Sequence, residues 1–222
     1  MNPKALAFRF VSIATLGFLS AFTALAGIIP VANASFETLP AAGLTFVGCG
    51  AGCSFSEAVI PGWSNSGISG QFQPGTPATT FFTSLPDGPT VAFSNDTTPP
   101  ISQTVGPKVQ LGVTYTLMVD LGWRNDFGSF TSAADLMING NAITAIGTAP
   151  TQGNWSTFTA TYTGLASDVG SSITIELLTS GGQGDFDNVR LSDSTVPEPA
   201  GFTLLGLGLA GLLVFARRQR AS

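Results

Sequence analysis

An alternation of apolar and mostly polar residues over positions 113–121 is the sequence feature that most constrains the fold. Successive side chains of a β-strand point to opposite faces, so this pattern predicts a strand with one buried face. Shorter segments of the same kind follow at 155–162 and 172–177, rich in β-branched and aromatic residues. No internal stretch of the sequence combines a helical apolar period with helix formers and caps. The chain is therefore predicted to be all-β.

A hairpin and several further strands complete the predicted architecture. Segments 135–138 and 142–146 flank Asn139-Gly140, a pair that tolerates the positive φ angles of a type I′ turn. Further strands are expected at 28–37, 79–84, 90–94, 101–105 and 186–191. About ten short strands in a single unit spanning residues 27–196 predict a β-sandwich of the jelly-roll kind.

Composition narrows the function of this unit by exclusion. Residues 27–196 contain three cations (Lys108, Arg124 and Arg190) against twelve acids, a net charge of −9. Nucleic-acid binding needs clustered cations, so that class is excluded. The chain contains no histidine, which excludes Ser-His-Asp and Cys-His catalysis and imidazole metal sites.

The N-terminus has the order of a secretory signal peptide. Lys4 and Arg9 precede an uncharged run over residues 10–29, and small residues at Ala24 and Ala26 form a cleavage pattern. We expect residues 1–26 to be the signal peptide and residues 27–196 to be the domain. An uncleaved membrane anchor is the alternative interpretation.

The C-terminus combines Pro197-Glu198-Pro199, an apolar run at 201–216, and a basic tail that includes Arg217 and Arg218. A generic single-span anchor would explain the apolar run and the arginines, but not the Pro-Glu-Pro. Residues 197–222 resemble the PEP-CTERM sorting signal. The resemblance implies an exosortase as partner and a precursor held in the inner membrane by its C-terminal transmembrane helix. It also implies later transfer to the cell surface or extracellular matrix.

Three short segments of the domain resemble the galactose-binding-like jelly roll found in carbohydrate-binding modules: 33–37, 60–63 and 186–191. In that family a structural calcium lies where the first and last strands meet. The matching residues here are Glu37 and Asp187, with Asp185 as a third carboxylate, and such oxygen ligands suit calcium. The alternative is that these acids cap strand ends or pair with Arg190.

Cys49 and Cys53 lie in a Gly-rich loop of a chain expected to be exported, where thiols are oxidised. We therefore predict a disulfide between them. A zinc site would need two further thiolate or imidazole ligands, and the sequence has neither another cysteine nor a histidine.

A strand-to-loop transition at Trp123, Arg124, Asn125 and Asp126 offers the parts of a sugar site. Sugar rings pack their C–H faces on flat aromatic rings, while charged and amide groups hydrogen-bond the hydroxyls. The alternatives are that Trp123 belongs to the core, as expected for Trp63 and Trp155, and that Arg124 and Asp126 form a surface ion pair.

No motif in the sequence singles out a pair of catalytic carboxylates or a nucleophile with its base. The sequence thus predicts a non-enzymatic, exosortase-sorted jelly roll that binds exopolysaccharide or another glycan. The alternative is a structural or adhesive matrix protein without a ligand site. Among cofactors, only the structural calcium is expected.

Overall fold

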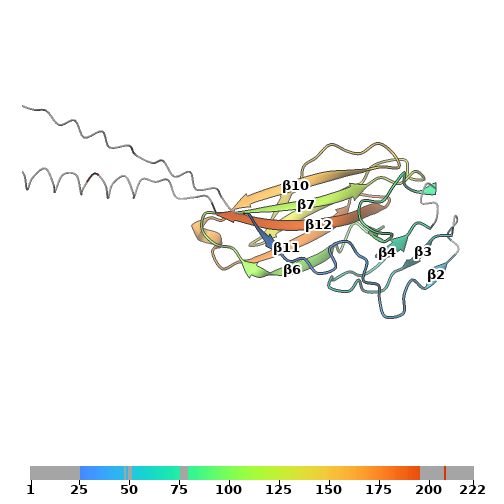
Figure 1. Ribbon diagram of the computed structural model, residues 1–222, viewed down its shortest axis with the longest axis horizontal. Helices are drawn as coiled ribbons and strands as arrows, with labels where there is room; N and C mark the ends of the chain where they lie inside the picture. The colour runs from blue at the N-terminus through green and yellow to red at the C-terminus, as the bar shows by residue number, and fades with distance from the viewer. Residues whose placement is uncertain (1–25, 48, 50–51, 76–79, 196–207, 209–222) are drawn as a thin grey trace, which may run out of the picture.

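A computed structural model of the chain describes residues 26–47, 49, 52–75, 80–195 and 208 (Figure 1). The described residues form two antiparallel sheets packed face to face, as the strand pattern predicts. The strands are β1 (Ala26–Ile29), β2 (Phe46–Val47), β3 (Ser54–Ser56), β4 (Ser69–Gln73), β5 (Val91–Ser94), β6 (Ile101–Lys108), β7 (Val113–Gly122), β8 (Ser132–Ile138), β9 (Asn141–Thr144), β10 (Trp155–Thr163), β11 (Ser172–Thr179) and β12 (Gly184–Thr195).

The larger sheet has eight strands in the order β10-β7-β12-β5-β4-β3-β2, with β1 paired to β12. The smaller sheet has four strands in the order β6-β11-β8-β9. A short 3-10 helix, η2 (Ala166–Asp168), lies between β10 and β11. Among the described residues, no helix has the length and apolar character needed to cross a bilayer.

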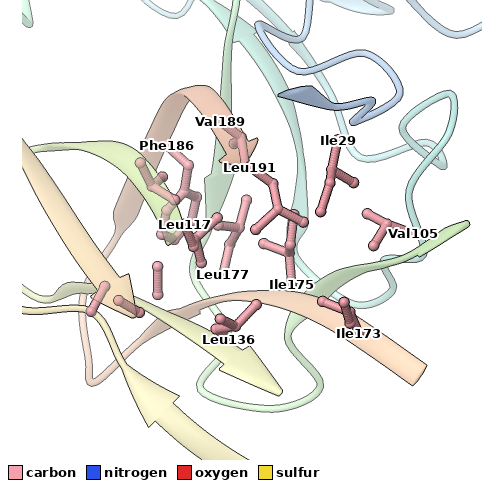
Figure 2. Close-up of a cluster of buried hydrophobic side chains, with 14 of the residues drawn as sticks. Ile29, Val105, Leu117, Leu136, Ile173, Ile175, Leu177, Phe186, Val189 and Leu191 are labelled. Atoms are coloured by element: carbon pink, nitrogen blue, oxygen red, sulfur yellow. The ribbon is translucent and has the colours of Figure 1, made fainter. Parts of the chain in front are cut away.

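The main core lies between the two sheets (Figure 2). In β7, Val113, Tyr115, Leu117, Val119 and Leu121 all point into this core, which confirms the alternation seen in the sequence. The facing strands contribute a second set of fully buried residues: Leu136, Ile138, Ile173, Ile175 and Leu177. Burial of apolar side chains from both sheets is the main source of stability for such a sandwich.

The Asn139-Gly140 turn has the predicted geometry, with φ values of 50° and 77°, and joins β8 to β9. The predicted strand at 28–37 is wrong beyond Ile29. The chain turns at Asn33 and Phe36, which have φ values of 47° and 60°, and this turn buries Phe36 completely in the core. The strand predicted at 79–84 is also wrong over its described residues 80–84, which form no strand. Phe81 and Phe82 of this segment are instead buried in a cluster of aromatic side chains.

The described chain ends lie at one end of the sandwich, and the short strands β2, β3 and β4 lie toward the other. Both described chain ends, Ala26 and Thr195, lie at the end where β7 begins, since Ala26 pairs with Ser194 and Thr195 with Val113 (Figure 1). Strands β2, β3 and β4 lie toward the opposite end, where β7 finishes at Gly122 (Figure 1). We refer to this second end as the distal end.

Candidate functional site

A row of four residues crosses the outer face of the larger sheet near the distal end. Phe93 on β5 pairs with Asp185 on β12, Asp185 pairs with Gly122 on β7, and Gly122 pairs with Trp155 on β10. Their neighbours along the strands, such as Leu121 and Phe186, face the main core instead. The row therefore places one carboxyl group among aromatic rings on the face that the main core does not use.

A second apolar cluster covers this part of the outer face. It is built from buried Cys53, Phe72, Phe81, Phe82, Val91 and Phe93, with Phe55, Leu85 and Trp155 packed against it. The rings meet mostly edge to face: Phe72 and Phe81 lie 5.3 Å apart between ring centroids, and Phe55 and Phe93 lie 6.0 Å apart. Trp155, which packs against this cluster, covers Gly122 of β7 and explains why that residue is buried although it faces away from the main core.

A pocket of about 160 Å³ opens beside the cluster. Its wall combines aromatic, charged and amide side chains: Cys49, Cys53, Phe55, Glu57, Phe72, Phe81, Phe93, Asn95, Arg124 and Gln183. The volume is below the roughly 300–1,000 Å³ that is usual for drug-sized ligands. The pocket therefore has room for one ring rather than for an extended chain.

Arg124 forms one wall of the pocket. Its guanidinium carbon lies 4.4 Å from the ring centroid of Phe81, 5.0 Å from that of Phe72 and 5.1 Å from that of Phe127. Both oxygens of Asp126 accept hydrogen bonds from Arg124, at 2.9 Å from Nε and 2.7 Å from Nη2. The ion pair and the ring contacts together fix the plane of the guanidinium.

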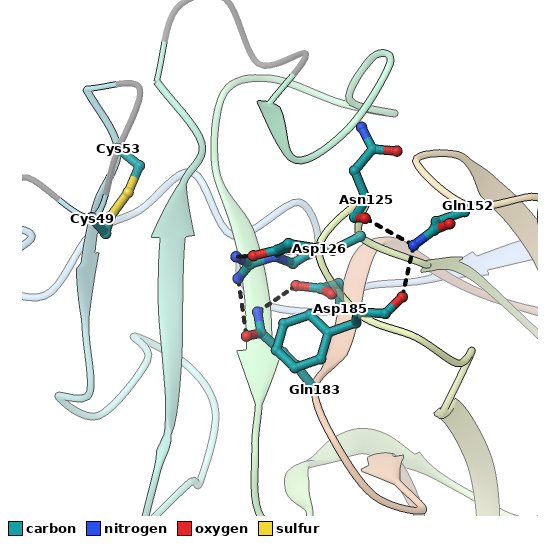
Figure 3. Close-up of polar contacts among 9 residues, drawn as sticks. Cys49, Cys53, Asn125, Asp126, Gln152, Gln183 and Asp185 are labelled. Atoms are coloured by element: carbon teal, nitrogen blue, oxygen red, sulfur yellow. Dashed lines mark hydrogen bonds and ion pairs between the residues drawn. A yellow bond between two sulfur atoms is a disulfide. The ribbon is translucent and has the colours of Figure 1, made fainter.

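A chain of polar contacts leads from the pocket wall to Asp185 (Figure 3). Arg124 donates from Nη1 to Oε1 of Gln183 at 3.0 Å, and Gln183 donates from Nε2 to Oδ1 of Asp185 at 2.8 Å. Oδ2 of Asp185 is buried and accepts no hydrogen bond. Burial raises the pKa of Asp185 to about 7, while the nearby Arg124 opposes that rise.

Of the four residues predicted from the sequence to bind sugar, only Arg124 lies in the wall of this pocket. Arg124 lies in the pocket wall, and its ion pair with Asp126 is the alternative expected for these two residues. Trp123 is not in that wall, since its ring faces Phe130 and its Nε1 donates to the carbonyl of Phe127 at 2.9 Å. Asn125 is an exposed residue whose carbonyl accepts a hydrogen bond from Gln152 (Figure 3).

The three predicted calcium ligands also lie in two different surroundings. Asp185 belongs to the pocket side, whereas both Glu37 and Asp187 bind the loop at 87–90. Oε1 of Glu37 accepts from the Thr90 amide at 2.9 Å, and Oδ2 of Asp187 accepts from the Asp87 amide at 3.0 Å. Burial raises the pKa of Asp187 to about 8, and repulsion from Asp87 and Glu37 adds to the effect.

These contacts match the alternative in which the acids cap loop and strand ends. Arg190 forms its ion pair with Asp120, at 3.2 Å, rather than with either acid. In the part of the chain that the structure describes, no three Asp, Glu, Cys or His side chains are grouped so that they could hold a metal ion. Calcium stays a prediction, which a calcium-dependent melting temperature would test.

The predicted disulfide between Cys49 and Cys53 is confirmed. Figure 3 shows the bond. Both cysteines line the pocket, and Cys53 is buried in the second cluster. Trp63 lies in the main core as expected, and Trp155 packs against the second cluster. The predicted sorting residues Pro197, Glu198, Pro199, Arg217 and Arg218 lie outside the described residues, as does the signal peptide except for Ala26.

Sequence reasoning missed the aromatic half of the pocket. Phe55, Phe72, Phe81 and Phe93 come from the segment 55–93, which has several Pro-Gly turns and in which strands were expected only at 79–84 and 90–94. The signal that was present is the density of phenylalanine in that segment, which exceeds what short exposed loops need.

Two packed antiparallel sheets, with a small aromatic pocket at the distal end of one of them, define an all-β jelly-roll protein. The chain belongs to the HpiC1-like family, described as HpiC1 cyclase, which matches residues 28–192. Residues 195–220 match the PEP-CTERM protein-sorting motif, which confirms the resemblance seen at the C-terminus. A search of curated proteins gave no match.

Two solved structures of cyclases share the fold. The Stig cyclase Fisc from Fischerella sp. TAU, in complex with (3Z)-3-(1-methyl-2-pyrrolidinylidene)-3H-indole, is 22% identical with a TM-score of 0.62. That match covers 78% of this chain and 100% of the cyclase. A cyclase from the same organism in complex with 4-(1H-Indol-3-yl)butan-2-one is 22% identical with a TM-score of 0.59, covering 76% and 98%. The CBM22-1 xylan-binding domain of Paenibacillus barcinonensis Xyn10C is 12% identical with a TM-score of 0.39, covering 78% and 94%.

Proposed function

We propose that this exosortase-sorted jelly-roll protein binds one sugar ring of an exopolysaccharide in its distal pocket, without chemical conversion. The observation that carries the proposal is the pocket wall itself, where phenylalanine rings stand beside Arg124, Gln183, Asn95 and Glu57. Aromatic faces accept the C–H side of a sugar ring, and planar guanidinium and amide groups hydrogen-bond its hydroxyls.

Size and charge narrow the ligand further. A pocket of about 160 Å³ accommodates a terminal or branching sugar unit rather than several consecutive units. Arg124 is already paired with Asp126, and Glu57 adds a carboxylate to the wall. Together with the −9 charge of residues 27–196, this favours neutral or amino sugars over acidic ones.

Calorimetric titration with neutral, amino and acidic monosaccharides, followed by a glycan array, tests the proposal. Asn95→Ala and Gln183→Ala should each weaken binding, because both side chains line the pocket. Trp123→Ala serves as the comparison, since its ring faces Phe130. Binding that is lost in Trp123→Ala but kept in both pocket variants would move the site to the loop. No binding to any glycan would favour the structural or adhesive role.

A second function is supported by one specific observation. Asp185 is fully buried, has an oxygen without a hydrogen-bond partner, and is joined to the pocket through Gln183. Burial raises the pKa of this carboxyl group to about 7, so it holds a proton near neutral pH and can act as an acid once a ligand displaces the Gln183 amide and reaches it. The family carries the description of a cyclase. Binding of 4-(1H-Indol-3-yl)butan-2-one, the ligand of one related structure, provides a probe.

The two functions differ in what Asp185→Asn does. Sugar binding should survive this substitution, because the amide keeps the size of the side chain and Gln183 still lines the pocket. An acid-assisted conversion should be abolished while binding of the indole probe remains. Unchanged turnover of any substrate in Asp185→Asn would remove the second function.

A further inference from the structure

Three aliphatic side chains are exposed at the end of the sandwich opposite the pocket. Leu111 is 66% exposed, Leu165 is 58% exposed and Val169 is 54% exposed. They lie on two loops: Leu111 lies between β6 and β7, and the other two flank η2 between β10 and β11. We call these three residues the apolar tip.

Backbone hydrogen bonds hold the two loops together. The amide of Gly112 donates to the carbonyl of Gly164 at 2.9 Å, and the amide of Gly170 donates to the carbonyl of Val109 at 2.9 Å. The one acid between the tip residues, Asp168, is buried and accepts hydrogen bonds from Tyr162 and Asn139. The apolar tip is thus one fixed surface, without a carboxylate pointing outward from its loops.

The apolar tip lies where the chain continues into its sorting tail. Val113, which follows the Leu111 loop, pairs with Thr195 at the end of β12, and both described chain ends leave the fold here (Figure 1). The sorting motif begins at residue 195, and its apolar run at 201–216 follows within a few residues. Few residues therefore separate this end of the domain from the apolar run that the sequence analysis expects in the membrane.

We propose that the apolar tip inserts into the interfacial layer of the bilayer while the precursor is held by its tail. The contact is apolar: three aliphatic side chains at the boundary between headgroups and acyl chains, on a domain whose acidic charge disfavours anionic surfaces. Insertion would set the domain upright, with the pocket at the distal end turned away from the membrane and toward the matrix.

The full-length chain in phosphatidylcholine nanodiscs provides the test. A fluorophore is attached at Ala166→Cys, an exposed position on the tip loops, or at Ser129→Cys, an exposed position at the distal end. The native cysteines stay in their disulfide. Quenching by spin-labelled lipids and by a water-soluble nickel chelate then reports the position of each label. We expect lipid quenching at Ala166→Cys with little aqueous quenching, and the reverse at Ser129→Cys.

A matched pair of triple variants makes the test specific. Leu111→Ser, Leu165→Ser and Val169→Ser together should lower lipid quenching at Ala166→Cys to the level seen at Ser129→Cys. Val59→Ser, Ile68→Ser and Ile146→Ser remove three comparably exposed aliphatic side chains elsewhere and should change nothing. Circular dichroism melting verifies that both variants are folded.

Two outcomes would overturn the proposal. Equal aqueous quenching at Ala166→Cys and Ser129→Cys would mean that the tip stays in water. Protection of Ala166→Cys from both quenchers would mean that a protein surface, such as a second copy of this chain, covers the tip instead of lipid.

Discussion

The indole ring of Trp155 lies directly over Gly122, its partner on the neighbouring strand. A Cβ atom at Gly122 would approach Cζ3 of Trp155 to 2.8 Å, closer than two carbon atoms can come. The absence of a side chain at Gly122 is therefore what allows the ring to pack flat on the outer face and against Phe82, at 4.7 Å between ring centroids. From this position Trp155 packs against the second cluster.

Gly122→Ala should consequently destabilise the fold by about 1–3 kcal/mol, because the added methyl group must displace the indole. Urea unfolding followed by tryptophan fluorescence measures the loss. Gly106→Ala is the matched control, since that strand glycine has open space around it and no positive φ. The same unfolding midpoint in the two variants would show that Trp155 can shift without cost.

Arg124 should contribute to stability through its ring contacts as well as its charge. We expect Arg124→Ala to lower the free energy of unfolding by about 1–2 kcal/mol, because the guanidinium contacts three phenylalanine rings and its side chain is only 11% exposed. Arg124→Lys keeps the charge but loses the planar fork, so it should recover less than half of that loss. Asp126→Asn, which removes the exposed partner alone, should cost under about 1 kcal/mol in the same urea titration.

The sequence predicts well those strands that pack one face against the core and leave the other face outside it, because their residues then alternate between apolar and polar. In β7, one face meets the main core along most of the strand, so apolar and polar residues alternate. The segment after Ile29 fails because a tertiary contact overrides its strand propensity. Phe36 reaches the core only from a backbone with a φ of 60°, a conformation that residue types alone do not predict.

The pocket was predictable only in part, for a similar reason. Arg124 and Asp126 lie two positions apart in the sequence, so their ion pair could be expected. The rings that contact Arg124 include that of Phe72, on a strand that the sequence did not predict, and that of Phe81, on a loop that the sequence predicted as a strand. Asp185 comes to lie behind the pocket wall through strand pairing with Phe93 and Gly122, and pairing over such sequence distances is a property of the whole fold.

Asp168 should make stability depend on pH at the acidic end. The hydrogen bond from Tyr162 lowers the pKa of the Asp168 carboxyl below its ordinary value of 3.8. A group whose pKa is lower in the folded state stabilises the fold above its unfolded pKa, and that contribution is lost as pH falls through the folded value. Asp168→Asn should therefore melt below the wild type at pH 7, and the two melting temperatures should converge as pH falls below 3.8.

Tyr162→Phe is the matched variant for this effect, because it removes the donor and keeps the ring. This substitution should raise the pKa of Asp168 toward its ordinary value. The melting temperature of Tyr162→Phe should therefore fall less than that of the wild type as the pH is lowered. Thermal melts of the wild type and both variants, from pH 7 to below pH 3.8, measure these melting temperatures. A constant difference between wild type and Asp168→Asn across this range would contradict the assignment.

The disulfide between Cys49 and Cys53 should link stability to the pocket. Replacing both cysteines with serine should cost about 2 kcal/mol by the loop-entropy relation for so short a loop. The cost should fall mainly on the second cluster, where Cys53 is buried. Because both cysteines also line the pocket, reduction should weaken ligand binding along with lowering the melting temperature.

Melting with and without a phosphine reductant measures the effect, and the double serine variant, which has no bond to reduce, is the control. A wild-type melting temperature that the reductant leaves unchanged, with reduction verified by thiol labelling, would show that the loop is held by its packing alone.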